Sequence, residues 1–248
     1  MRLGYNWQFG PFELADRIGV DWLVERLEAD AIEVPPLLRL AVGRGFYDQG
    51  EPLGLDGSYR PIVRPPGVML LADIKRSAAP LRRNRSAALW DVGDGVVCLE
   101  FTTKANTIDA DVIAMVEEAV ALVPQLHKAL VIYNEGADFS CGANLAEVDA
   151  ELACGNWAAI DTLVTRGQRA YQALRDAPFP VVGAPSGMAL GGGREVLLHC
   201  DAIQAHTETY MGLVECGIGL IPGWGGCLAM LERWTQAGKL PRGPMPVV

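Results

Sequence analysis

Three consecutive glycines, Gly191–Gly193, followed by Arg194 and Glu195, constrain the fold of this chain more than any other segment. Glycine has no Cβ atom, so a ligand can approach the main chain closely at such a run. The residues that follow, 195–199, favour a helix, and the first amides of a helix have no acceptor within it and can bind partial negative charge. The segment predicts an oxyanion site beside Glu195. A structural alternative is a tight strand-to-helix turn in which Glu195 only complements the helix dipole.

The bulk composition is that of a globular protein. A length of 248 residues allows one large domain or two smaller ones, and a net charge of -9 argues against nucleic acid or an anionic membrane as partner. No apolar run reaches the roughly 18 residues of a membrane span, and the N-terminus has no apolar signal core. The six cysteines form no Cys-x-x-Cys pair, which favours reduced thiols. We therefore expect a cytoplasmic protein that has no membrane partner.

Several common functional motifs are missing from the sequence. The glycines match neither the Rossmann nor the P-loop spacing, and Ser186 lacks the Gly-x-Ser-x-Gly frame of a nucleophile elbow. His199 and His206 do not have the spacing of metal ligands on a helix. We therefore expect no metal site and no dinucleotide site of the Rossmann type in this chain.

The first third of the chain divides into two segments by composition. Apolar residues at helical spacing predict helices over residues 3–46, the last of them opened by Pro35-Pro36. Proline and arginine are frequent over residues 48–86, which favours a linker that contains one helix between 67 and 79. We therefore predict a helical segment over 1–50 and a linker over 51–86.

From residue 87 onward strands and helices alternate. Strands are predicted over 88–92 and 96–101, on either side of a Gly-Asp-Gly turn, and over 129–133, 180–184 and 202–207. Helices are predicted over 110–126, 156–176 and 227–234. The repeated order of strand, strand and helix predicts a mixed α/β domain over 87–248 in which helices cover sheets.

Two further segments are candidates for a site. Glu215 lies in an apolar loop flanked by glycines, where a glutamate either faces water or occupies a pocket that perturbs its pKa. The loop 138–144 consists of small residues after a strand, and the amide of Cys141 could point inward. A thiol nucleophile at Cys141 is disfavoured because no histidine lies near it in the sequence.

Four segments in order, Lys104–Ile108, Phe139–Ala143, Gly187–Glu195 and Glu215–Gly226, resemble the crotonase superfamily, the enoyl-CoA hydratase and isomerase group. The resemblance covers about residues 86–236. It implies a crotonase-like spiral of repeated β-β-α units, a trimer or a dimer of trimers, and an acyl-CoA thioester as substrate.

The same resemblance assigns roles to individual residues. It implies that the amides of Cys141 and Gly192 form the oxyanion hole, and that Glu195 and Glu215 are the acid/base pair of a hydratase. Hydration takes one proton from water and delivers one to the α-carbon, whereas isomerisation needs only one such group. The pair therefore favours an enoyl-CoA hydratase over an isomerase. A non-catalytic fragment for acyl-CoA binding or assembly is a third possibility.

The contacts to CoA are less sharply indicated. Lys104, Ala143 and Gly191 are candidates from the resemblance, and the basic run 82–85 is a further candidate for the phosphates.

The N-terminal segment has its own resemblance. Gly4–Leu14, Asp16–Val20 and Gly45–Asp48 are similar to the end of the C-terminal domain of 3-hydroxyacyl-CoA dehydrogenases. The order of the two resemblances is that of bacterial multifunctional proteins of fatty-acid β-oxidation. We therefore expect a fragment whose crotonase-like domain is truncated at its C-terminus. NAD is expected only for the missing dehydrogenase domain, and no cofactor is expected in this chain.

Overall fold

The computed structural model describes residues 9–236, so the predicted helical residues 3–8 lie outside the described part. The chain divides into two compact units, Met1–Ala78 and Ala79–Val248. Each unit has its own cluster of buried apolar side chains.

The first unit contains short helices and one small hairpin. Its elements are α2 (Pro11–Ile18), α3 (Val20–Ala29), α4 (Pro36–Leu40), β1 (Tyr47–Asp48), β2 (Glu51–Pro52) and α5 (Leu71–Ser77). Val20, Ala41, Phe46 and Leu53 form its buried cluster. The Asp16 carboxylate of α2 accepts the amides of Phe46 at 2.6 Å and Tyr47 at 3.0 Å, which ties the helices to the hairpin. The prediction of helices in this segment is confirmed for the described residues.

The predicted boundaries at residues 50 and 86 differ from the division of the structure into its two compact units. Strand β2 pairs with β1, and Leu53 is buried in the core of the first unit, so the start of the predicted linker is folded structure. At its other end, β3 (Arg82–Arg83) pairs with β4 (Ala87–Asp91) and belongs to the second unit. Proline content was misleading here because an edge strand tolerates Pro52. Along the chain, the division between the two units falls between Ala78 and Ala79.

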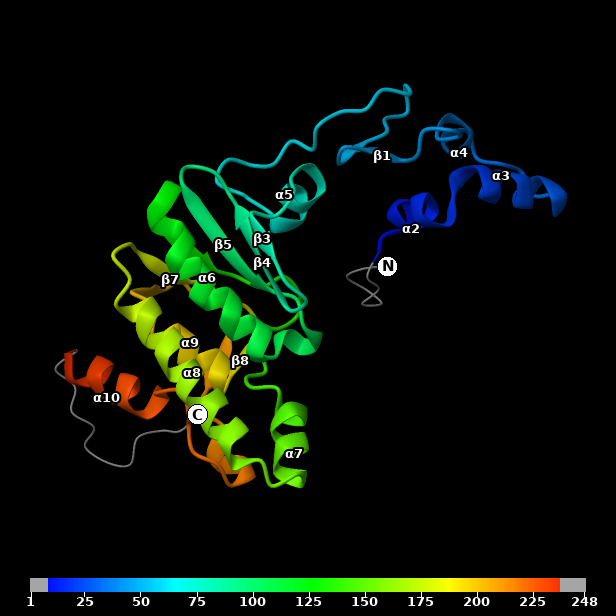
Figure 1. The fold of residues 1–248 in the computed structure, drawn as a ribbon. Coiled ribbons are helices and arrows are strands. Elements are labelled where there is room, and N and C mark those ends of the chain that lie inside the picture. Colours follow the sequence, from blue (N-terminus) through cyan, green and yellow to red (C-terminus); the bar gives the residue numbers. More distant parts are fainter. Residues whose placement is uncertain (1–8, 237–248) are drawn as a thin grey trace. The chain divides into compact units, whose positions relative to one another are not determined.

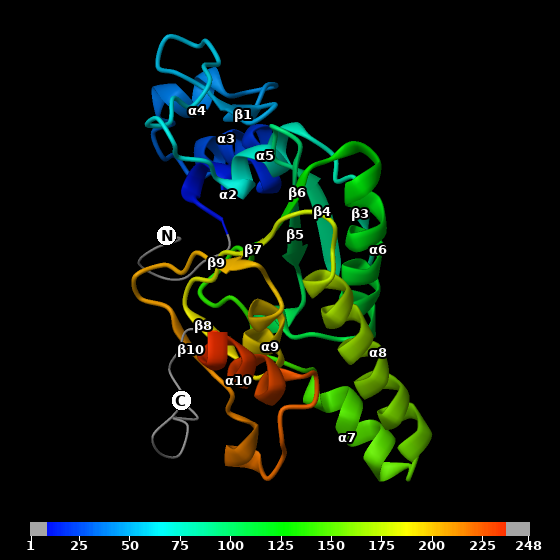
Figure 2. The same ribbon diagram turned by 90° about the vertical axis from the view of Figure 1, so that its left-hand side faces the viewer.

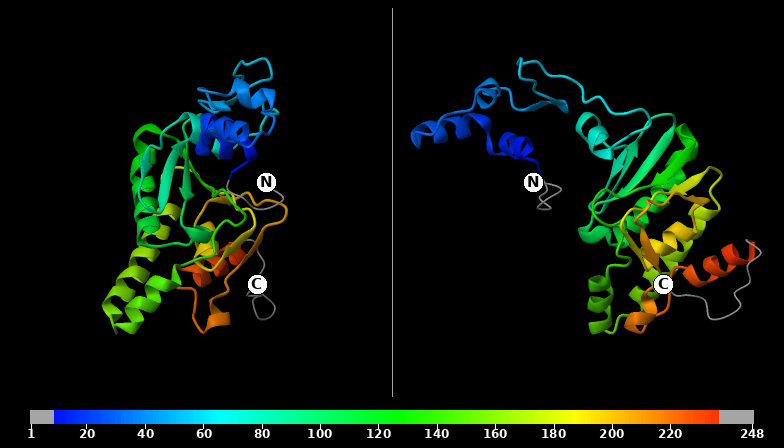
Figure 3. Two further views of the ribbon diagram at one scale, coloured as in Figure 1. Left: turned by 90° about the vertical axis from the view of Figure 1, so that its right-hand side faces the viewer. Right: turned by 180° about the vertical axis from the view of Figure 1, so that it is seen from behind.

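The second unit is built around a six-stranded sheet in the order β3-β4-β5-β6-β7-β9. Its strands after β4 are β5 (Val96–Phe101), β6 (Ala129–Ile132), β7 (Val181–Gly183) and β9 (Ala202–Ile203). β3, β4 and β5 pair antiparallel, whereas β5, β6, β7 and β9 pair in parallel. Helix α6 (Ala110–Leu126) packs on this sheet, and α8 (Trp157–Arg175) packs against α6 (Figure 1, Figure 2). Figure 3 shows the same sheet from two further sides.

A second, smaller sheet carries the glycine-rich segment. Strand β8 (Met188–Leu190) pairs in parallel with β10 (Tyr210–Gly212), and Ser140 forms a parallel bridge to Ala189. Helix α9 (Gly192–Leu198) follows β8, and α10 (Gly226–Gln236) follows β10 after the short 3-10 helix η2 (Glu215–Ile218). The order strand, strand, helix thus occurs at β4-β5-α6, β7-β8-α9 and β9-β10-α10. This confirms the predicted β-β-α repeats.

The core of the second unit lies between the sheet and its helices. Val112, Met115, Val116, Ala119 and Val123, the predicted apolar face of α6, are all buried. Helix α7 (Leu145–Ala153) was not predicted, because its sequence has only a weak apolar face. None of its residues is fully buried. In the part of the chain that the structure describes, no helix combines the length and apolar character of a membrane span.

Candidate active site

Glu195 is the fourth residue of α9, and its side chain is only 2 % exposed. Its Oε1 atom accepts two backbone amides, from Trp224 and from Gly226, each at 2.8 Å. Burial raises the pKa of Glu195 to about 7, although the two amides favour the charged form and act against this. The carboxyl group is therefore held in place by Trp224 and by Gly226, the first residue of α10, and its pKa lies near neutral pH.

Glu215 is the first residue of η2 and lies beside the glycine run. A Cβ atom added to Gly191 would lie 3.1 Å from Oε1 of Glu215. The Oε2 atom is buried and has no hydrogen-bond partner among residues 9–236. Burial also raises the pKa of Glu215. An unpartnered buried carboxyl oxygen is a group that a substrate or a water molecule could satisfy.

The two glutamates share one site. The negative charge of Glu215 contributes to the raised pKa of Glu195, so the two carboxyl groups interact electrostatically. Glu215 lies against Gly191 of the glycine run. Glu195, which follows that run in α9, lies against Gly226. The structure thus brings together two residues that are 20 positions apart in the sequence. Two neighbouring acids with raised pKa values can hold different protonation states, as general acid and base catalysis requires.

Three residues of the loop 139–143, and Asn144 directly after it, have backbone amides that donate to acceptors within the protein. The amides of Ser140, Cys141, Gly142 and Asn144 donate to Met188 O at 2.9 Å, Ala105 O at 3.2 Å, Ser140 Oγ at 3.1 Å and Ile108 O at 2.9 Å. Within residues 9–236 the amide of Ala143 has no acceptor. The parallel bridge between Ala143 and Ile108 is formed by the carbonyl of Gly142 and the amide of Asn144, which both bond to Ile108. The N–H of Ala143 therefore faces away from Ile108.

Ala143 and the start of α9 approach each other at the backbone. A Cβ atom added to Gly192 would lie 3.5 Å from the Ala143 nitrogen, and one added to Gly142 would lie 3.1 Å from the Gly192 nitrogen. Gly142 has φ +89°, so both its conformation and its surroundings require glycine. The amide of Gly192, in the first turn of α9, also has no acceptor in the described part of the chain. Two unpartnered amides therefore lie side by side.

The geometry changes one of the assignments for the oxyanion hole. Gly192 is available as expected, but the Cys141 amide is occupied by the Ala105 carbonyl. Ala143, expected only as a CoA contact, supplies the unpartnered amide instead. The physical reason lies in the loop itself. The Cys141 amide faces the Lys104–Asn106 turn, and the positive φ of Gly142 (+89°) changes the direction of the backbone between Cys141 and Ala143.

Other predictions for this region have mixed outcomes. The Gly191 amide donates to the Gly212 carbonyl at 2.9 Å and is not available to a ligand. Burial and the nearby Asp138 raise the pKa of the Cys141 thiol, which does not favour a thiolate nucleophile.

Two of the candidates for CoA phosphates line one pocket. Arg85 and Lys104 border a pocket of about 550 Å³ together with Asn144. Lys104 is exposed. Arg85 forms an ion pair with Asp111 at 3.1 Å. Arg82 of the same basic run pairs with Glu118 instead. Ala105 also lines this pocket, and its carbonyl accepts the amide of Cys141 in the loop 139–143.

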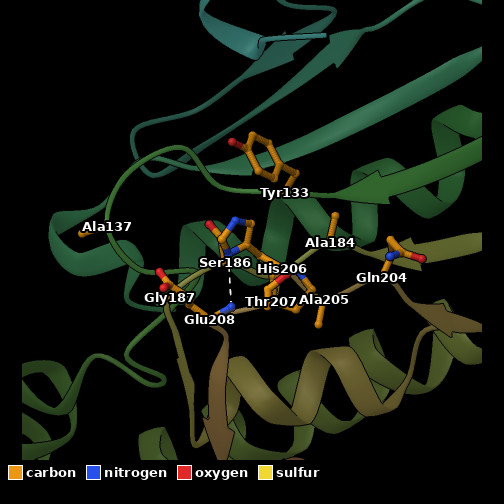
Figure 4. Close-up of a pocket in the computed structure, with 11 residues that line it drawn as sticks. Tyr133, Ala137, Ala184, Ser186, Gly187, Gln204, Ala205, His206, Thr207 and Glu208 are labelled. Carbon is orange, nitrogen blue, oxygen red and sulfur yellow. Dashed lines mark hydrogen bonds between the residues drawn. The ribbon is translucent and has the colours of Figure 1, made fainter. Parts of the chain in front are cut away.

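A second pocket, of about 750 Å³, lies away from the two glutamates. It is lined by residues that follow the parallel strands β6, β7 and β9, among them Tyr133, Ser186 and His206 (Figure 4). The Glu208 amide donates to His206 Nδ1 at 3.3 Å on its rim. None of the candidate residues for the reaction lines this pocket.

A family model described as enoyl-CoA hydratase/isomerase matches residues 92–237. The chain belongs to this family. The matched stretch includes both glutamates, the loop 139–143 and the glycine run. The family assignment therefore agrees with the crotonase resemblance of the sequence.

Among curated proteins, the chain is 38% identical over 254 residues to a probable 3-hydroxyacyl-CoA dehydrogenase of Bacillus subtilis, which covers 97% of this chain and 31% of that protein. It is 38% identical over 133 residues to the fatty acid oxidation complex subunit alpha of Vibrio cholerae, covering 50% of this chain and 18% of that protein. The chain thus spans less than a third of the length of these relatives.

Solved structures show the same fold. DspI of Pseudomonas aeruginosa superposes with a TM-score of 0.56 at 28% identity, covering 62% of this chain and 59% of the other. An enoyl-CoA hydratase from Bacillus anthracis superposes with a TM-score of 0.54 at 24% identity, covering 60% and 58%. These likenesses confirm the predicted crotonase-like fold.

Several residues of the site were not found from the sequence. The amides of Trp224 and Gly226 hold Glu195, and Trp224 packs against the glycine run, since a Cβ atom on Gly192 would lie 2.5 Å from its ring. The repeated glycines around Trp224 were the only local signal, because they indicate close packing without naming the partner.

Proposed function

We propose that this domain hydrates 2-enoyl-CoA thioesters by syn addition of water across the double bond. The observation that carries the proposal is the pair of carboxyl groups, buried Glu195 and partly buried Glu215, beside the unpartnered amides of Ala143 and Gly192. An oxyanion hole stabilises the enolate that forms at the thioester, and the two carboxyl groups supply the proton transfers.

The proposed reaction needs no redox step. The oxygen of water bonds to the β-carbon while one carboxylate takes a proton from that water. The electron pair of the double bond moves toward the thioester carbonyl, whose oxygen accepts hydrogen bonds from the two amides. The other carboxyl group then delivers a proton to the α-carbon. Atoms and charges balance, and each carboxyl group regains its state when a proton exchanges with solvent.

The remaining assignments are part of the same proposal. Lys104 and Arg85 are suited by charge and by their shared pocket to the phosphates of CoA. The hydration chemistry calls for no cofactor, and we assign any NAD site to the region of the relatives that this chain does not span. We also propose a cytoplasmic location and assembly as a trimer or a dimer of trimers. Sedimentation velocity of the purified protein tests the assembly.

The test is the hydration of crotonyl-CoA, followed by the loss of its absorbance. Glu195→Gln and Glu215→Gln keep the shape of each side chain but remove its proton exchange, so we expect each to lower kcat by about 100-fold or more. Glu208→Gln, at an exposed position, is the matched control and should retain turnover. If both site variants hydrate crotonyl-CoA at the parental rate, the proposal is wrong. Conversion of a 3-enoyl-CoA without hydration of the 2-enoyl isomer would identify an isomerase.

A further inference from the structure

Two buried hydroxyl groups form hydrogen bonds with the backbone at the two unpartnered amides. Tyr171 of α8 bonds to Gly192 itself, and Ser140 of the loop 139–143 bonds to Gly142, the residue before Ala143. Both side chains have an exposed fraction of 0 %. Neither was singled out by the sequence patterns, and neither takes part in the proton transfers proposed above.

The hydroxyl of Tyr171 donates to the carbonyl oxygen of Gly192 at 3.2 Å. Its ring packs edge-on against Trp224, with 5.5 Å between the ring centroids. On another side it lies 5.6 Å from the ring of His199, whose Nδ1 is 2.8 Å from the carbonyl oxygen of Glu195. Tyr171 thus contacts the first turn of α9, the residue whose amide holds Glu195, and a residue bonded to the Glu195 backbone. Tyr171 thereby links α8 to both ends of α9, at Gly192 and at the C-cap residue His199.

The hydroxyl of Ser140 performs the corresponding task on the other side. It donates to the Asn106 carbonyl at 2.7 Å and accepts the Gly142 amide at 3.1 Å. A Cβ atom added to Gly193 would lie 2.7 Å from the Ser140 Cβ, so this side chain packs directly on α9. Ser140 therefore connects the turn of Ala143 to the helix that carries Gly192.

We propose that Tyr171 and Ser140 are positioning residues that set the spacing and direction of the Gly192 and Ala143 amides. The inference rests on the proposed function, because it assigns to these amides the role of an oxyanion hole. Such donors act strongly only when they are held in place before the charge develops, and small displacements reduce the rate. A buried hydrogen bond at each backbone segment supplies that constraint without touching the substrate.

Removing each hydroxyl while keeping the rest of the side chain tests the proposal. We expect Tyr171→Phe and Ser140→Ala each to lower kcat for crotonyl-CoA about tenfold, with little change in KM. Tyr210→Phe removes a hydroxyl from a tyrosine that is 54% exposed, and Ser77→Ala removes one from an exposed serine. Both controls should keep the parental kcat.

A spectroscopic readout separates positioning from a loss of stability. 4-(Dimethylamino)cinnamoyl-CoA absorbs further to the red when its thioester carbonyl is polarised by hydrogen bonds. We expect the unmodified protein to shift its absorption to the red, and the two variants to bind it with a smaller shift per bound molecule. Because only folded protein binds the probe, partial unfolding lowers the amount bound but leaves the shift of each bound molecule unchanged. If Tyr171→Phe does not fold, Ser140→Ala decides the question.

The possible outcomes are distinct. Variants with the parental shift and the parental kcat would overturn the positioning role while leaving the hydratase proposal intact. A parental shift with lower thermal stability would also overturn it, because the residues would then be only structural. An unmodified protein that neither hydrates crotonyl-CoA nor shifts the probe would instead remove the proposed function, and the positioning role with it.

Discussion

At the scale of single residues, the chemistry of the site depends on how the fold treats Glu195. The carboxyl group is buried and yet accepts two amides, so desolvation and hydrogen bonding act in opposite directions on its pKa. Desolvation prevails, and the pKa rises to about 7 from an ordinary 4.5. The same residue therefore costs stability when it ionises, which is a frequent property of reactive groups.

This shift predicts how stability depends on pH. Between pH 4.5 and 7 the folded protein binds the Glu195 proton more tightly than the unfolded chain does, so the free energy of unfolding falls as the pH rises through this window. Glutamine cannot ionise, so Glu195→Gln should remove this decline, with a gain relative to the parent of up to about 3 kcal/mol at pH 8 compared with pH 4. Urea unfolding at both pH values measures it. If the free energies of unfolding of parent and variant differ by the same amount at pH 4 and pH 8, the predicted pKa shift is contradicted.

At the scale of elements, the site depends on short connections between paired strands. The turn before β8 is the most confined of these, because a Cβ atom on Gly187 would lie 1.8 Å from the carbonyl oxygen of Ala137. That carbonyl belongs to the segment leading into the loop 139–143. The Asp138 carboxylate also accepts the Met188 amide at 3.0 Å, which joins the two segments.

A pair of glycine substitutions tests this confinement. Gly187 and Gly219 both have a positive φ, of +65° and +78°, but Gly219 has no atom within 4 Å of an added Cβ. Gly219→Ala should therefore cost only the backbone strain, about 1 kcal/mol of unfolding free energy. Gly187→Ala should cost at least about 3 kcal/mol, because the backbone of the neighbouring loop must move. Thermal and urea unfolding compare the two. Equal losses would show that the clash is relieved without cost.

At the scale of the whole molecule, the chain contains two units with separate cores. The first has a small buried cluster around Phe46, whose ring lies 4.7 Å from that of Phe12. The second has a much larger cluster between the six-stranded sheet and its helices. Separate cores of unequal size predict that each unit responds to its own core substitutions.

Limited proteolysis followed by mass spectrometry tests this independence. Phe46→Ala removes a ring that is 5% exposed, and such a truncation costs about 3–5 kcal/mol, enough to unfold a small unit. We expect cleavage before residue 79 and protection of the second unit. Leu99→Ala, at a fully buried position of β5, should produce cleavage after residue 79. Cleavage throughout the chain of Phe46→Ala would show that the units unfold together.

The elements with strong local patterns were predictable. The hairpin of β4 and β5 and the long helices α6 and α8 were predicted to within a few residues, because each has enough residues for its apolar period to be evident. Strands β8 and β10 were missed, since three residues are too few to show alternation. The folded start of the predicted linker was not evident, because its few buried apolar residues, such as Leu53, stand among prolines.

By itself the sequence determined the chemical groups of the site: two glutamates, a glycine run that admits close backbone contact, and a loop of small residues. Their order along the chain was enough to indicate the family, because that order can be read from the sequence without any knowledge of distances. Only the tertiary structure decided which amide is unpartnered, which amides hold Glu195, and that Tyr171 lies behind Gly192. Those facts depend on contacts between residues far apart in the chain, such as Glu195 with Trp224 and Gly226 at separations of 29 and 31. Apolar periodicity indicates which residues form an element, but not which backbone groups of distant loops meet.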